Sequence, residues 1–376
     1  MKHRDRISKR NLLLAGLLVA IAATAAVSAY RSVMKASGTD FSRWPVDTSR
    51  YEIQTLPFQF AASYVRGNDL YFATNDGRLL YSRGDESVAP FVELTSPIPG
   101  SGWAPHLIFV SSSGALFLST KTGPIYRSGD SGRNWTQVLV FPGWRMDEVK
   151  PGVLALGNYP QFPYPTPEIL TRNPLGATIF LSRDDGRTWT PREVNARAQH
   201  VHSVRWDERS QRLYLAYGDG EFRGEGYIDL EADRLTVTGT GPRDGHTDVA
   251  FTRDYVFWGS DDGSGRVLRE DRKTGQVKTV LSSPGHYIWW IITDGEQLFL
   301  GTAASVAEKR SVVLASQDQG ESWQKLIESE PSRRPYDRGF QSESRNASVN
   351  GWVYCSNGEN AYRFRRASSG SRAIGK

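Results

Sequence analysis

Short runs of apolar residues separated by turn residues fill the chain from Tyr51 onward. The runs are rich in Val, Ile, Leu, Phe and Tyr, and Gly, Asp, Asn or Pro stands between them. Such runs are typical of β-strands, and four of them recur in units of about 40–50 residues, the period of a β-propeller blade. No convincing amphipathic helix follows the N-terminal segment. The pattern therefore predicts an all-β fold built from repeated four-stranded units.

The units can be counted from their first strands. Six units begin near Phe58, His106, Glu148, His202, His246 and His286. A last unit offers only three runs, near Phe340 and within residues 351–355 and 361–364. The unassigned strand at residues 51–54 would complete it, and such a closure leaves no open sheet edge in the ring. The sequence predicts a seven-bladed β-propeller over residues 50–366, with six blades as the alternative.

One turn pattern, Ser-x-Asp-x-Gly-x-(Asn/Thr/Ser)-Trp, occurs three times between apolar runs. The copies place Asp130, Asp184 and Asp318 at the same point of the turn. The carboxylate can accept hydrogen bonds from its own turn, Gly supplies a positive φ, and Trp packs the hairpin onto the sheet. The pattern resembles the Asp-box (BNR) repeat of the sialidase-like β-propellers. In that family the box lies opposite the functional face, so we expect these aspartates to be structural.

The first 29 residues differ from the rest of the chain. Basic residues precede an apolar run over residues 12–27, and residues 27–29 resemble a signal-peptidase site. We interpret residues 1–29 as a signal peptide or, through residues 11–29, a membrane anchor. Residues 30–49 are expected to be a linker and residues 367–376 a disordered tail. The folded part should be extracytoplasmic (periplasmic or secreted), and only its N-terminal segment should meet a membrane.

The formal net charge of +5 is concentrated in that segment. Residues 1–29 contribute +4, so the remainder carries about +1 and gives nucleic-acid binding no electrostatic support. The only cysteine, Cys355, lies in an apolar run, which excludes an intrachain disulfide and predicts a buried, inert thiol. We expect a monomer with no nucleic-acid partner.

Histidines recur near the start of successive predicted inner strands. His202, His246 and His286 are about one repeat apart, and His106 lies about two repeats before His202. Equivalent positions on inner strands of a propeller point together around the central channel. We therefore expect these histidines to converge at one mouth of the channel, with His200 nearby. Duplication alone is the competing explanation, in which such a histidine only caps a strand or holds channel water.

Loops between second and third strands should open at the same mouth and bring carboxylates to it. Imidazoles and carboxylates can act as acid and base or bind a divalent metal, the one cofactor that the sequence suggests. The candidate catalytic residues are His202, His246, His286, Asp219 and Asp261, and the three histidines are also the metal candidates. The candidate substrate-binding residues are Trp103, His106, Glu148, Tyr159, Tyr287, Gln341 and Arg345.

The favoured function is binding or processing of a glycan or polysaccharide at this mouth, by a glycoside hydrolase or a polysaccharide lyase. The histidines together with Gln341 loosely resemble the site of seven-bladed, metal-dependent uronate lyases. The sequence argues against an exo-sialidase, because neither a triad of carboxylate-binding arginines nor a Tyr-Glu pair can be assigned. The alternative is a non-catalytic scaffold, since sialidase-like propellers also resemble assembly factors that bind a protein partner through the same face.

Overall fold

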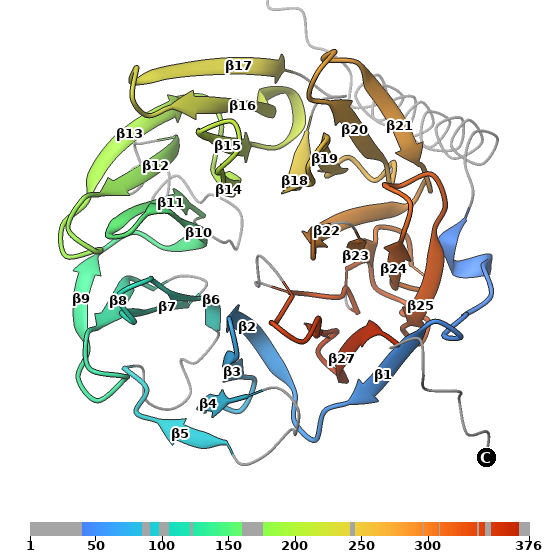
Figure 1. Ribbon diagram of the computed structural model, residues 1–376, viewed down its shortest axis with the longest axis horizontal. Helices are drawn as coiled ribbons and strands as arrows, with labels where there is room; N and C mark the ends of the chain where they lie inside the picture. The colour runs from blue at the N-terminus through green and yellow to red at the C-terminus, as the bar shows by residue number, and fades with distance from the viewer. Residues whose placement is uncertain are drawn as a thin grey trace, which may run out of the picture.

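Seven sheets stand around a central axis and form a closed ring in the computed structural model (Figure 1). The structure describes residues 40–84, 91–97, 105–120, 123–159, 176–240, 245–295, 297–307, 309–336, 338–342 and 347–367. Within these ranges six sheets have four strands and one has three. The predicted seven-bladed β-propeller is confirmed. The expected signal or anchor and nearly all of the expected tail lie outside the described residues.

Each complete blade is an antiparallel meander that runs from the channel to the rim (Figure 1). Blades 1 to 3 comprise β2 to β13: Phe60–Arg66, Asp69–Thr74, Leu79–Arg83, Val92–Leu94; Pro105–Val110, Leu116–Thr120, Ile125–Ser128, Thr136–Leu139; Gly143–Lys150, Val153–Asn158, Ala177–Ser182, Thr190–Asn195. Blades 4 to 6 comprise β14 to β25: Val201–Asp207, Arg212–Tyr217, Gly224–Asp229, Arg234–Thr240; His246–Phe251, Tyr255–Ser260, Val267–Asp271, Val277–Leu281; His286–Thr293, Leu298–Ala304, Val312–Ser316, Gln324–Glu328. Blade 7 comprises β26 (Val353–Ser356), β27 (Ala361–Arg366) and β1 (Tyr51–Thr55).

Blade 7 joins the two ends of the chain. The N-terminal strand β1 pairs antiparallel with β27 on its outer side, and an isolated bridge between Gln341 and Ser356 continues the blade on its inner side. The Arg363 guanidinium donates two hydrogen bonds to Gln54 Oε1, at 2.9 and 2.7 Å, and so ties β27 to β1. The predicted closure by the N-terminal strand is therefore confirmed.

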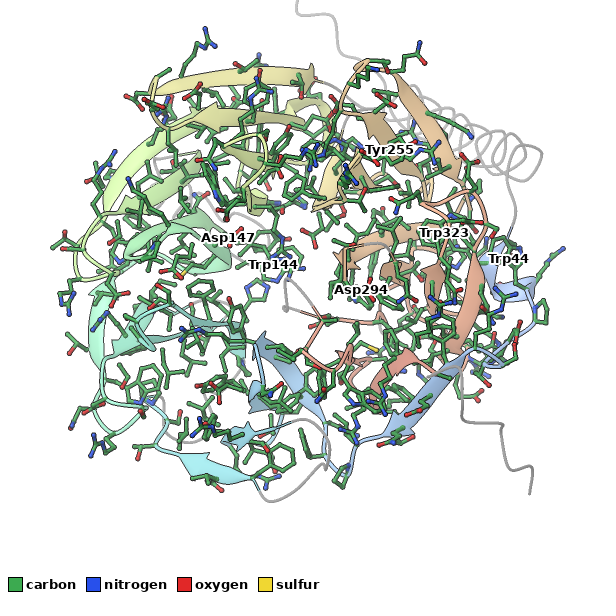
Figure 2. All side chains as sticks on the ribbon, viewed as in Figure 1. Trp44, Trp144, Asp147, Tyr255, Asp294 and Trp323 are labelled. Carbon is green, nitrogen blue, oxygen red and sulfur yellow. The ribbon has the colours of Figure 1, made fainter. Side chains whose placement is uncertain are left out.

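Residues 40–47, which the sequence analysis assigned to a linker, are docked on blades 5 and 6. The 3-10 helix η1 (Phe41–Arg43) inserts the fully buried Phe41 among apolar residues of those two blades. The Phe41 N–H donates to Ser283 Oγ at 2.9 Å, and Val46 bridges Lys325 of β25. Figure 2 shows Trp44 of this segment at the outer edge of the ring, near Trp323. Among the described residues, no helix has the length and apolarity that crossing a membrane requires.

The Asp boxes form the hairpins between the third and fourth strands of blades 2, 3 and 6. In blade 3, Ser182 Oγ donates to Asp184 Oδ1 at 2.8 Å and accepts from the Gly186 N–H. Thr188 donates to the same carboxylate through both its N–H and its hydroxyl. Gly186 has φ +76°, in the left-handed region where glycine is free of strain. Each box thus closes its own turn, and the other two repeat these bonds.

Candidate functional site

The two ends of the channel are different. We call the end where the inner strands begin, together with loops 218–223 and 261–266, the upper mouth. The opposite end, where the Asp boxes lie, is the lower mouth. Connections alternate between the two ends because every blade is an antiparallel meander.

Six inner strands share a one-residue register shift near the upper mouth. The residues inside the shift are, in chain order, Ala61, His106, Trp144 with Arg145, His202, Thr247 and Trp289. An extra residue in one strand re-aims the neighbouring side chains and sharpens the local twist. His106 and His202 therefore occupy equivalent positions. His246 precedes its shift by one residue and His286 by three, so the four histidines are not equivalent.

The expected convergence of His246 and His286 with His202 does not occur. His286 is fully buried on the far side of β22, where its ring packs on Phe41 at 5.1 Å and its Nε2 lies 3.0 Å from the Arg310 carbonyl oxygen. His246 faces the interface between blades 4 and 5, where it pairs with Glu225 and packs on Trp258. Both side chains serve contacts within or between blades, because their positions relative to the register shift turn them away from the mouth.

Glu148 lies at the wrong end of its strand for the expected role. The structure starts β10 at Gly143, five residues earlier than the sequence analysis placed the unit, so Glu148 reaches the lower mouth. There its carboxylate accepts from the Ser112 N–H and hydroxyl, both at 2.7 Å, and fixes the neighbouring blade's turn. Gln341 is held by backbone hydrogen bonds to Ser356. Trp103 and Arg345 lie outside the described residues.

Three expected residues, with His200, do meet at the upper mouth. His200 Nε2 and His202 Nε2 lie 2.8 Å apart, and Asp219 places one carboxylate oxygen 3.4 Å from each of these nitrogens. On the other side of the His202 imidazole, Nδ1 lies 3.3 Å from Asp261 Oδ2. Both imidazoles are buried, at 3% exposure each, whereas the Asp219 side chain is 52% exposed. The cluster therefore combines a buried imidazole pair with one accessible carboxylate.

Aromatic rings cover this cluster. Tyr159 packs on His200 at 4.3 Å between centroids and meets Trp144 edge-on at 4.7 Å. His106 stacks on Trp144 at 5.2 Å, with the two ring planes only 14° apart, and its ring centroid lies 5.4 Å from that of Tyr159. Figure 2 shows Trp144 at the inner end of β10, beside the central opening. Trp144 was missed in the sequence because the unit was started too late, although its place after Gly143 at a strand start was a usable signal.

Burial and charge divide the protonation states within the cluster. Burial lowers the pKa of His200 to about 3, helped by the charge on His202. Burial also opposes the charged form of His202, but the carboxylates of Asp261 and Asp219 outweigh it and raise its pKa. Burial would raise the pKa of Asp219, but the hydrogen bond and charge of His202 reverse the sign and lower it. Burial raises the pKa of Asp261 to about 6. Of the two imidazoles, His202 is therefore the one whose protonated form the cluster favours.

Below the mouth, charged side chains fill the channel. The Arg145 guanidinium, 2% exposed, reaches from blade 3 to the carbonyl oxygens of Ser342 at 3.0 Å and Trp289 at 3.4 Å. Since these acceptors belong to blades 6 and 7 on the other side of the ring, Arg145 crosses the channel. Beneath it, Arg205 of β14 pairs with Asp248 of β18. The upper mouth therefore has a floor that contains the buried Arg145 and the buried Arg205–Asp248 ion pair.

A tyrosine pair stands at the upper mouth on the blade 6 side, where Tyr287 belongs to β22. The rings of Tyr287 and Tyr336 lie 5.2 Å apart and their hydroxyl groups are 3.1 Å apart. Tyr336 is 45% exposed and has φ +67°. A bulky residue in the left-handed region costs about 1–2 kcal/mol, and such strain gathers at binding sites. Nothing in the sequence around Tyr336 signalled this conformation.

Comparison with known proteins gives one curated relative and several structures of the same fold. No family model matches the chain. The photosystem II assembly protein Ycf48 of Synechococcus sp. (strain JA-2-3B'a(2-13)) is 24% identical over 204 residues, which cover 52% of this chain and 55% of Ycf48. The match thus spans about half the length of this curated relative. An identity of 24% over about half of each protein does not show that this chain belongs to the same family as Ycf48.

Solved structures resemble the chain over most of its length. YCF48 bound to D1 peptide gives a TM-score of 0.55 at 13% identity, covering 88% of this chain and 99% of the other. YCF48 from Cyanidioschyzon merolae gives 0.56 at 12%, covering 84% and 98%. An extracellular domain from B. thetaiotaomicron gives 0.60 at 12%, covering 86% and 40%. At these identities the likeness shows the propeller fold, and it does not establish membership of the sialidase-like family.

The expected glycan-processing function is wrong. The curated relative is an assembly protein, and one of the similar structures holds a peptide of a protein. The geometry agrees with this correction, because His246 and His286 are engaged away from the mouth and the expected ring of acid–base groups does not form. The protein-binding alternative of the sequence analysis is the one that the comparisons favour.

Proposed function

We propose that this chain is a non-catalytic propeller that binds a segment of a protein partner at its upper mouth and assists the assembly of a larger complex. The observation that carries the proposal is the similarity to Ycf48, an assembly protein, over 204 residues. The propeller of YCF48 bound to D1 peptide, which matches 88% of this chain, supports a protein segment as the ligand.

The surface of the upper mouth suits such a ligand. Half-buried or exposed aromatic side chains surround it: Trp144, Tyr159, Tyr287, Trp289 and Tyr336. Tyr and Trp are enriched at the centres of protein interfaces, because each offers a large apolar area and a polar group with few torsions to immobilise. The floor beneath them is rigid, since Arg145 is bonded to Ser342 and Trp289. A rigid, aromatic mouth can hold an extended segment at little cost in its own conformational entropy.

We further propose that the ring works outside the cytoplasm. The basic and then apolar residues 1–29 support export or anchoring. The single cysteine, Cys355, is buried, and burial raises the pKa of its thiol. A stable ring without disulfides then depends on the packing between blades and on the closure by β1.

The proposal is tested by co-purification from the native host. The tagged chain is isolated from the extracytoplasmic fraction as wild type, as the double variant Tyr287→Ala/Tyr336→Ala, and as a control, Val277→Ala. Val277 is 60% exposed on the rim strand β21, far from the mouth. Co-purified proteins are identified by mass spectrometry, and the affinity of each variant for the purified partner is then measured.

We expect one partner to be retained by the wild type and by Val277→Ala. Loss of two aromatic anchors at an interface centre should weaken its binding by about 2–4 kcal/mol, or roughly 30- to 1,000-fold. Equal affinity of all three proteins would place the binding surface elsewhere. Turnover on a polysaccharide panel, read as reducing ends or ultraviolet absorption, would contradict the non-catalytic function.

A further inference from the structure

We infer that the upper mouth holds a divalent transition-metal ion on His200, His202 and Asp219. Such a site differs from the three-histidine site expected from the sequence, since it uses neither His246 nor His286. It also uses two residues, His200 and Asp219, that the expected metal set left out.

The ligand atoms already have the spacing of a coordination sphere. The two Nε2 atoms lie 2.8 Å apart. His200 Nε2 lies 3.4 Å from Asp219 Oδ2, and His202 Nε2 lies 3.4 Å from Asp219 Oδ1. Zinc binds imidazole nitrogen and carboxylate oxygen at about 2.0–2.2 Å, so neighbouring ligand atoms of a tetrahedral site lie about 3.3 Å apart. One ligand atom from each of the three residues lies within 4.8 Å of the other two. An ion requires the two nitrogens to separate by only a few tenths of an ångström.

The backbone explains why two imidazoles face one point. His200 immediately precedes β14, and His202 is the residue inside the register shift of that strand. The extra residue re-aims the His202 side chain, so both imidazoles reach the upper mouth. Asp219 comes from the loop after β15, the strand that pairs with β14. The donors are thus presented by two adjacent strands of one blade, which makes the site rigid.

The surroundings supply a second coordination shell. His202 Nδ1 faces Asp261 Oδ2 at 3.3 Å from the neighbouring blade. A carboxylate behind a histidine fixes the tautomer that leaves the other nitrogen free for the metal, and this arrangement accompanies most histidine ligands. Tyr159 covers His200 on its other side. The half-exposed Asp219 side chain leaves the site open to solvent, so an ion can enter from the mouth and retain water as a further ligand.

The donor set indicates the class of ion. Two imidazoles and one carboxylate suit zinc and its first-row neighbours, whereas magnesium and calcium prefer oxygen ligands alone. The competing explanation is a metal-free network in which a protonated His202 bridges Asp219 and Asp261. The metal site and the metal-free network differ in ion binding, because only the metal site binds an ion with fixed stoichiometry.

The test uses the purified full chain without any partner. After chelation and dialysis, zinc is added in a calorimetric titration, and cobalt(II) is added in a parallel one followed by its visible absorption. The variants are Asp219→Asn, whose side chain is half exposed and so leaves folding intact, and Asp261→Asn. The matched control is His106→Ala, which removes an imidazole from the same aromatic cluster but not from the donor set.

The wild type and His106→Ala should each bind one zinc ion, and cobalt(II) should show the intense bands of a four-coordinate site. Asp219→Asn should abolish stoichiometric binding, and Asp261→Asn should weaken it by about 10- to 100-fold. Absence of stoichiometric binding to the wild type, or unchanged binding to Asp219→Asn, would overturn the inference. The result is independent of the proposed protein-binding function, which needs no ion and has its own readout.

Discussion

The guanidinium of Arg205 forms a two-point ion pair with the carboxylate of Asp248 across the interface between blades 4 and 5. Nε and Nη2 of Arg205 lie 3.0 and 3.1 Å from the two carboxylate oxygens, and the Asp248 side chain has no exposed surface. The same carboxylate accepts from Ser203 Oγ at 2.9 Å and from the Ile291 N–H of blade 6 at 3.3 Å. One buried aspartate thus connects three successive blades below the upper mouth.

Replacing Asp248 by Asn should destabilise the ring strongly. The substitution leaves Arg205 buried without its counter-charge, and breaking a buried pair in this way costs about 3–5 kcal/mol. The free energy of unfolding in urea measures the loss. Glu321→Gln is the control, because the Glu321 side chain is 51% exposed and its ion pairs with Lys278 and Arg269 should together contribute only about 1 kcal/mol. Equal effects of the two substitutions would contradict the role given to Asp248.

Acid should weaken a second link between blades 4 and 5. Asp207 accepts from Arg272 at 2.6 and 3.0 Å; burial would raise its pKa, but Arg272 and Ser210 outweigh burial and lower it. A lowered pKa stabilises the fold above the unfolded value of about 3.9, and this contribution disappears as the pH falls through the folded value. The free energy of unfolding between about pH 7 and pH 3 should fall less steeply for Asp207→Asn than for the wild type. Parallel curves would show that Asp207 carries none of the acid sensitivity.

The Asp-box glycine of blade 3 should tolerate no side chain. A Cβ on Gly186 would lie 2.3 Å from the Phe117 ring of blade 2, at φ +76°. The left-handed backbone costs about 1–2 kcal/mol and the overpacking about 1–3 kcal/mol, so Gly186→Ala should lose about 2–5 kcal/mol. Gly275→Ala is a matched control, with φ +69° but open space around its Cβ. Gly275→Ala should lose only the about 1–2 kcal/mol of stability that the left-handed backbone costs. Similar losses of stability in both variants would show that the clash with Phe117 does not contribute.

The closing strand should contribute directly to stability. Tyr51 of β1 is 6% exposed, packs on Phe299 of blade 6, and accepts a hydrogen bond from Gln317 at 3.0 Å. Tyr51→Ala should cost about 3–5 kcal/mol, as for other large buried aromatic residues, and Tyr51→Phe only about 1 kcal/mol. Thermal unfolding of the three proteins would measure both. A small effect of Tyr51→Ala would mean that β1 is dispensable for the closed ring.

The sequence predicted the architecture because the relevant signals are local or periodic. The boxes around Asp130, Asp184 and Asp318 define hairpins within a few residues, and alternating apolar runs define the strands. The closure was predicted because the last unit was one strand short and the strand at residues 51–54 belonged to no other unit. Residues 40–47 were assigned to a linker because Phe41 docks through a single buried ring, which leaves no periodic pattern.

The candidate site was predicted less well because it depends on register. Spacing by one repeat locates a residue to within two or three positions, but a shift of one position turns a side chain to the other face. The register shift at His202 aims that side chain at Asp219, whereas His246 and His286 miss their shifts by one and three residues. Asp219 and Asp261 were found because loops after second strands meet at one mouth whatever the register.

The central claim is that a protein segment binds at the upper mouth, and site-specific photo-crosslinking in the native host tests it most directly. A benzoylphenylalanine replaces Tyr336, which is exposed at the mouth, or Val277 on the rim strand β21. We predict a discrete crosslink to one protein from position 336 and none from position 277, with the crosslinked peptide confined to one segment of the partner. Crosslinks of equal yield from both positions, or none from position 336 while the partner still co-purifies, would contradict the account.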